Sequence, residues 1–128
     1  MSALVVDTSI WVEFFRGAPL PALEDALHDG LVLLPPVVAA ELLSAPLSAS
    51  ERRKLSDFLS DLPLHPTPFA HWEAVGALRA HLSRRGLSVS TPDAHVAECS
   101  IEAGAFLWSK DAIFRKMTRA SELRLFAA

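Results

Sequence analysis

The sequence lacks several features that would point to particular classes of protein. Cys99 is the only cysteine among 128 residues, so no disulfide can form within the chain and a reducing compartment fits best. The first 15 residues have no basic leader and are interrupted by Asp7 and Glu13, which argues against a signal peptide or a membrane span. Internal repeats, low-complexity tracts and long linkers are missing as well. We therefore expect one soluble, cytoplasmic domain that covers residues 1–128 and does not enter a membrane.

Basic charge is also scarce. The formal net charge is −3, whereas proteins that bind nucleic acids usually carry a basic surface. The overall charge therefore counts mildly against a nucleic-acid partner. Charge that is clustered in space can still reverse the local sign, so the motifs have to decide the question.

Apolar residues, by contrast, are plentiful. They make up 51% of the chain, which is enough for a well-filled core in a domain of this length. Short apolar runs predict strands, the last of them an edge strand. These runs are residues 3–6, 31–34, 105–108 and 123–126.

Helical spacing of apolar residues, helix caps and terminating glycines predict helices between the strands. Strands that alternate with helices indicate a parallel sheet with helices on both faces, which is a three-layer α/β sandwich. The predicted helices cover residues 8–16, 21–29, 37–44, 51–62, 69–85, 92–103 and a last segment from 112 onward.

Hydroxyl side chains at the starts of these helices are expected to serve as N-caps. Thr8 or Ser9 would cap the first helix, and Ser48 or Ser50 would cap the charged helix ERRKLSDFLSDL. Thr91 would cap the helix in which Pro92 is the first residue.

Three aspartates are expected at one edge of the sheet. Ligands of an open parallel sheet bind beyond the carboxyl ends of the strands, where the strand order reverses. Asp7 directly follows the first predicted strand, and Asp111 follows the strand at 105–108. Asp93 lies in the first turn of a helix, where free amides and the helix dipole favour an ionised carboxylate.

Glu41 is unusual because its neighbours on the predicted helix are almost all apolar. A charge on such a face costs free energy unless it is paired, and that helix contains no lysine or arginine. This position therefore indicates a requirement for a cation.

Each of the four acids also has a purely structural explanation. Asp7, Asp93 and Asp111 could be helix caps, and Glu41 could turn outward into solvent. If they do converge, two unit charges 4 Å apart repel by about 4 kcal/mol at an effective dielectric constant near 20. Carboxylate oxygens suit Mg²⁺ or Mn²⁺, and such ions on a carboxylate cluster support phosphodiester hydrolysis.

Four segments in this order carry a family resemblance: VVDTS, VVAAELL, STPDAHVAECS and LWSKDAIF. They resemble the acidic motifs of PIN-domain ribonucleases, and the opening DTSIWVEFFRG is similar to VapC-type toxins of bacterial type II toxin–antitoxin pairs. The resemblance covers nearly the whole chain and implies a PIN-like fold that cuts RNA with Mg²⁺ or Mn²⁺.

The resemblance also implies roles for individual residues. Asp7, Glu41, Asp93 and Asp111 would be the metal-site acids, and Ser9 would orient Asp7 or a bound water. It further implies a homodimer, a small antitoxin whose tail blocks the site, and a larger toxin–antitoxin assembly.

One position departs from the family pattern. Many relatives have a further acid two residues after the one that Asp111 matches, whereas this chain has Ile113. A complete second metal site is therefore not expected from the protein alone, and substrate phosphate would have to help bring a second ion.

Basic side chains flank the Asp111 helix. Lys110, Arg115 and Lys116 could contact RNA phosphate, or they could simply form a solvated helix face.

His95 and Cys99 lie one helical turn apart and could bind a soft metal, but the sequence does not identify further ligands for it.

Two other functions remain open on the sequence. VVDTS superficially suits an aspartate-nucleophile phosphatase of the haloacid dehalogenase type, but those enzymes need a second acid where this chain has Ser9. A non-catalytic binding module with the same fold should lack a metal-site acid, and none of the four is missing.

Overall fold

The computed structural model describes residues 2–127 and contains a short, fully parallel sheet at its centre. Its strands are β1 (Leu4–Val6), β2 (Val32–Leu33) and β3 (Phe106–Trp108), in the spatial order β2-β1-β3. The middle strand β1 is completely buried because neighbouring strands and helices enclose it on all sides.

Each edge of the sheet is extended by a single bridge. Leu64 pairs with Leu34 beyond β2, and Leu125 pairs with Leu107 beside β3. The edge strand predicted at residues 123–126 is therefore reduced to one bridge, which two backbone hydrogen bonds of Leu107 hold in place.

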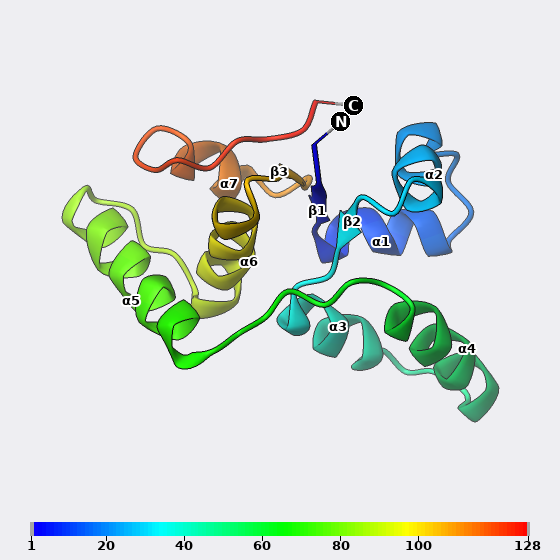
Figure 1. The fold of residues 1–128 in the computed structure, drawn as a ribbon. Coiled ribbons are helices and arrows are strands. Elements are labelled where there is room, and N and C mark those ends of the chain that lie inside the picture. Colours follow the sequence, from blue (N-terminus) through cyan, green and yellow to red (C-terminus); the bar gives the residue numbers. More distant parts are fainter. Residues whose placement is uncertain (1, 128) are drawn as a thin grey trace.

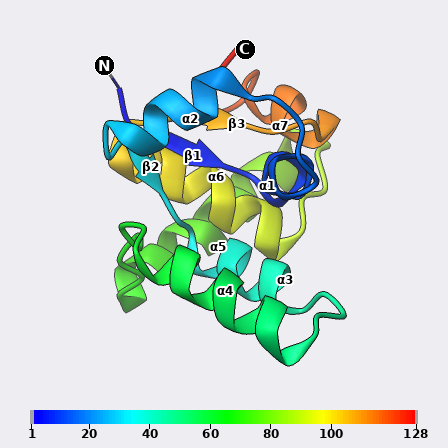
Figure 2. The same ribbon diagram turned by 90° about the vertical axis from the view of Figure 1, so that its right-hand side faces the viewer.

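Helices cover both faces of this sheet (Figures 1 and 2). The two views agree that α2 lies on one face and α6 on the other, while α5 packs on the outer side of α6. The predicted three-layer α/β sandwich is thus confirmed. The helices of the described chain are α1 (Thr8–Phe15), α2 (Pro21–His28), α3 (Pro36–Leu43), α4 (Ala49–Ser60), α5 (Phe69–Arg84), α6 (Thr91–Ala103) and α7 (Ala112–Met117).

The N-caps differ from two of the three predictions. Ser48 caps α4 in a reciprocal capping box with Glu51, which confirms the first of the two predicted alternatives, Ser48 or Ser50. Helix α6 is capped by Ser90 and not by Thr91, because a capping hydroxyl reaches the amide three residues later, here that of Asp93. Neither Thr8 nor Ser9 caps α1, whose N-cap position is occupied by Asp7.

The core lies between the sheet and the helices on its two faces. Val5 and Leu107 from the sheet, Trp11 from α1 and Phe114 from α7 are fully buried there. Among residues 2–127, none of the helices is both long enough and apolar enough to cross a lipid bilayer.

Candidate active site

Asp7 stands at the carboxyl end of the central strand. The register pairs Val6 of β1 with Trp108 of β3, so the next residues along the two parallel strands, Asp7 and Ser109, lie side by side. The backbone N–H of Asp7 donates to the Trp108 carbonyl over 2.9 Å. The Ser109 hydroxyl donates to Oδ2 of Asp7 over 2.7 Å, and the Ser9 hydroxyl donates to the same oxygen over 3.3 Å. The carboxylate is therefore oriented through one of its two oxygens.

Asp7 does not act as a helix cap, although it occupies the N-cap position of α1. Its side chain makes no capping hydrogen bond, so the structural explanation for this residue is wrong. Its carboxylate is instead held by the two serine hydroxyls.

Asp111 is connected to Asp7 through Ser109. Its backbone N–H donates to the Ser109 hydroxyl over 3.0 Å, and that hydroxyl in turn donates to Asp7. Oδ1 of Asp111 caps α7 by accepting the Ile113 N–H over 3.1 Å, so the cap explanation holds for this oxygen. The side chain of Ile113 packs against the core and adds no carboxylate to the site.

Asp93 completes a group of three aspartates. It is half-buried in the first turn of α6, and burial is the largest cause that raises its pKa. A hydrogen bond with Ser90 opposes this rise, while the charges of Asp111 and Asp7 add to it. The three carboxylates are therefore close enough to influence one another electrostatically.

Glu41 approaches the same edge from α3. Its Oε1 accepts a 2.8 Å hydrogen bond from the hydroxyl of Thr8, the residue that follows Asp7. The expected apolar surroundings are absent, because α3 buries Val38 and Leu42 and leaves Glu41 on its exposed side. The structure bears out the alternative that Glu41 turns outward into solvent, where Thr8 contacts it.

The four acids do not form a tight preassembled cage. Among residues 2–127, the group of closely spaced potential metal ligands comprises His65, His71 and Cys99, and none of the four acids belongs to it. A divalent cation that binds through one or two carboxylates and retains waters or substrate oxygens does not need such a cage.

The three basic residues considered for phosphate contact differ in their surroundings. The Nζ atom of Lys110 forms a 2.6 Å ion pair with Glu13, so its charge is partly neutralised within the protein. Arg115 and Lys116 are exposed in the last turn of α7, close in sequence to Asp111.

Ser109 is the residue that the sequence reasoning missed. It directly follows the strand β3, just as Asp7 follows β1. In a parallel pair of strands with the register Val6–Trp108, these two positions must be neighbours. The motif LWSKD contained the residue, but only the register identifies its partner.

A sequence model of the PIN domain matches residues 4–120, which is most of the chain. The protein belongs to the PIN domain family. The four predicted acids and Ser9 all fall within the matched region.

Solved structures with the same fold agree with this assignment. VapBC2 from Rickettsia felis, bound to a DNA fragment from its promoter, is similar with a TM-score of 0.77 and 21% identity over 97% of each chain. DNA-bound VapBC from Salmonella typhimurium gives a TM-score of 0.73 and 20% identity over 98% of each chain. VapBC-5 from Mycobacterium tuberculosis, a member of a family of toxin–antitoxin systems, gives 0.71 and 20% over the full length of both. No curated protein sequence matches the chain.

Proposed function

We propose that this protein is a metal-dependent ribonuclease and the toxin of a toxin–antitoxin pair. The observation that carries the proposal is the position of three aspartates, Asp7, Asp93 and Asp111, at one edge of the parallel sheet, with Glu41 approaching through Thr8. Membership of the PIN domain family supports nuclease chemistry at this edge.

The residues at this edge fit a hard divalent cation. All four candidate ligands offer carboxylate oxygens, which Mg²⁺ and Mn²⁺ prefer. The half-buried carboxylate of Asp93 resists ionisation, so a cation beside it would remove an electrostatic cost. When bound, such an ion would promote deprotonation of an attacking water and offset the negative charge on the phosphate.

The protein's own groups would orient the acids for this chemistry. Ser109 and Ser9 hold one oxygen of Asp7 through hydrogen bonds. The amide of Ile113 holds one oxygen of Asp111. In both acids the second oxygen can then face a ligand from a fixed direction, which reduces the entropy lost on binding.

We further propose that Arg115 and Lys116 contact RNA phosphate, because both are exposed on the helix that Asp111 caps. Lys110 could join them only by breaking its ion pair with Glu13.

A homodimer is part of the proposal. Large apolar side chains are exposed on the segment that leads into α5 and on its first turn, and a second copy of the chain could cover them. They are Leu64, Phe69 and Trp72, with exposed fractions of 59%, 77% and 37%.

Sequencing the 5′ ends of cellular RNA after brief induction tests the proposed activity and identifies the substrate. The wild-type protein should produce new ends at a small set of positions, because it would cut RNA at defined sites. Induction of Asp7→Asn to the same level should leave these positions intact. Equal patterns of RNA ends in the two cultures would contradict the proposal.

Co-expression with the neighbouring gene tests the proposed antitoxin partner. The similar VapBC structures and the negative edge of the sheet support an antitoxin that places an arginine or lysine among the acids. We expect the neighbouring gene to encode a short DNA-binding protein with a basic residue in its C-terminal half. Co-expression should relieve toxicity and yield a complex that co-purifies. Persistent toxicity with no complex would show that the pairing is wrong.

A further inference from the structure

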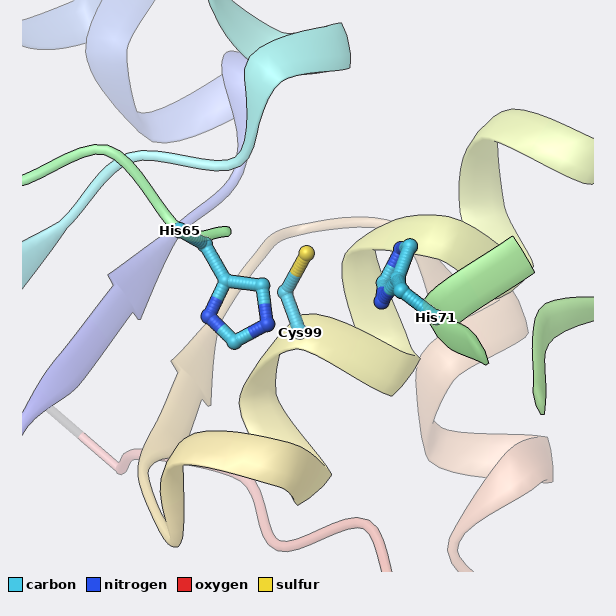
Figure 3. Close-up of side chains that lie close together, drawn as sticks. All are labelled: His65, His71 and Cys99. Carbon is cyan, nitrogen blue, oxygen red and sulfur yellow. The ribbon is translucent and has the colours of Figure 1, made fainter. Parts of the chain in front are cut away.

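A second group of metal-binding residue types is buried away from the aspartates. His65 precedes α5, His71 lies in its first turn, and Cys99 comes from α6. One ligand atom from each of the three lies within 4.8 Å of the others, and all three residues are at most 8% exposed. Figure 3 shows the Cys99 sulfur directed from α6 into the space between the two imidazole rings. Three separate segments of the chain thus bring nitrogen and sulfur donors to one point.

Hydrogen bonds orient the imidazole rings of His65 and His71, and the ring of His95 takes part in this network. The backbone N–H of Val37 donates to Nε2 of His95 over 3.4 Å, so this ring carries its own proton on Nδ1. That proton is donated to Nε2 of His71 over 2.7 Å, and Nδ1–H of His71 then donates to Glu102 over 2.9 Å. His65 donates to the same carboxylate from Nε2 over 2.8 Å. Two imidazole protons are therefore directed at a single carboxylate.

A metal cation can take the place of the two imidazole protons that face Glu102. An ion that displaced the two ring protons would find two nitrogens that already face the Glu102 carboxylate. The Cys99 sulfur belongs to the same group of potential ligands as the two histidines. Two imidazoles and a thiolate are the donors of zinc sites, whereas Mg²⁺ and Mn²⁺ prefer oxygen. We propose that His65, His71 and Cys99 form a binding site for Zn²⁺, with Glu102, which contacts both histidines, as the candidate donor for the fourth position.

The proposed zinc site is separate from the aspartate edge. Cys99 lies six residues after Asp93 on α6, which corresponds to about 9 Å along the helix axis. The two sites also differ in donor chemistry, so their ions would not compete. Zinc would connect α5, α6 and the segment before α5, and its effect would be on stability.

Uptake of zinc should depend on pH. Burial raises the pKa of the Cys99 thiol to about 12 in the metal-free protein, so the thiol is protonated at neutral pH. Binding as the thiolate releases this proton. The apparent affinity should therefore increase with pH.

Titration of the chelator-treated, full-length protein with Co²⁺ and then Zn²⁺ tests the site. One equivalent of Co²⁺ should give the thiolate charge-transfer band and the visible bands of a tetrahedral site, and Zn²⁺ should abolish both. Zinc at about 100 times its dissociation constant should raise the melting temperature by about 10 °C. Absence of a thiolate band in the wild type would overturn the proposal and leave a hydrogen-bonded network only.

Variants identify the ligands. Cys99→Ser should remove the thiolate band, and His65→Ala should weaken Co²⁺ binding at least about tenfold. His81→Ala is the matched control, because His81 lies on α5 but its ring bonds the Ala120 carbonyl outside the cluster. An unchanged band in Cys99→Ser would refute the assignment. If Cys99→Ser does not fold, the wild-type band and its weakening in His65→Ala decide the question.

Discussion

Replacing Asp7 or Asp93 by asparagine should lower RNA cleavage by about 100-fold or more while the protein remains folded. Asparagine keeps the size of the side chain but removes the negative charge that a divalent cation requires. A 100-fold loss corresponds to about 2.7 kcal/mol of transition-state stabilisation, which is modest for a group that holds a catalytic ion. Cleavage of a defined RNA under single-turnover conditions, with Mg²⁺ or Mn²⁺ in excess, measures the effect.

Two controls make this result specific. Asp57→Asn removes an exposed carboxylate on α4, far along the chain from the site, and should retain full activity. Circular dichroism should show the same helix content in all three variants. If both site variants cleave as fast as the wild type, and do so in excess EDTA, then neither the acids nor a metal ion take part in catalysis.

Bound metal should raise the melting temperature of the wild type, and Asp93→Asn should reduce this rise. In the proposed function Mn²⁺ would bind only the folded arrangement, so the ion at about 100 times its dissociation constant should add about 2.7 kcal/mol to the free energy of unfolding. For a domain of 128 residues this corresponds to a rise of about 10 °C. Asp93→Asn should gain less, because one ligand is missing.

Without metal, the order of the melting temperatures of the wild type and Asp93→Asn should reverse. The folded-state pKa of Asp93 is raised, chiefly by burial, so ionisation of this group costs stability. The cost is absent below the unfolded pKa near 4 and becomes complete as the pH rises past the folded pKa. In EDTA at pH 7, Asp93→Asn should therefore melt higher than the wild type, and the difference should shrink as the pH approaches 4.

Melting curves of both proteins, in EDTA and in Mn²⁺, at pH 4 and 7, check these expectations together. Cys99→Ser is a useful third protein, because it retains all four acids and removes a ligand of the proposed zinc site. A wild type that is indifferent to Mn²⁺, together with an Asp93→Asn variant that is less stable in EDTA, would show that the acids do not share a site.

Local patterns in the sequence were sufficient for the architecture. Short apolar runs identified all three strands of the sheet, and helical spacing identified the helices between them. Asp7 could be placed at the end of a strand because an acid cannot continue a run that is buried on both faces. Those inferences depend on neighbours along the chain, which the sequence contains.

Faces of helices were harder to assign. Apolar neighbours on the predicted helix made the charge of Glu41 look costly, yet Glu41 and its neighbour Ala45 are exposed. Alanine is small and mildly apolar, so it occurs on either side of a helix and does not mark the core. Which side of α3 faces inward was decided by the burial of Val38 and Leu42.

The same limit applied to the buried cluster. Helical spacing connected His95 with Cys99, because these residues are one turn apart on α6, but their side chains are only in loose contact at 3.7 Å. The neighbours that complete the group, His65 and His71, come from a loop and from α5. Their approach depends on how α5 packs against α6, which no spacing within one helix reveals.

The sequence by itself determined the order of strands and helices, the edge of the sheet at which acids gather, and the family. Each of these follows from the periodicity of side chains along a single segment, or from motifs in a fixed order. Tertiary structure alone decided that Ser109 bonds Asp7, that Glu41 is reached through Thr8, and that nitrogen and sulfur donors converge beside α6. These contacts join segments tens of residues apart. Their geometry is set by strand register and helix packing, which depend on the free energy of the whole chain. No single segment therefore determines them.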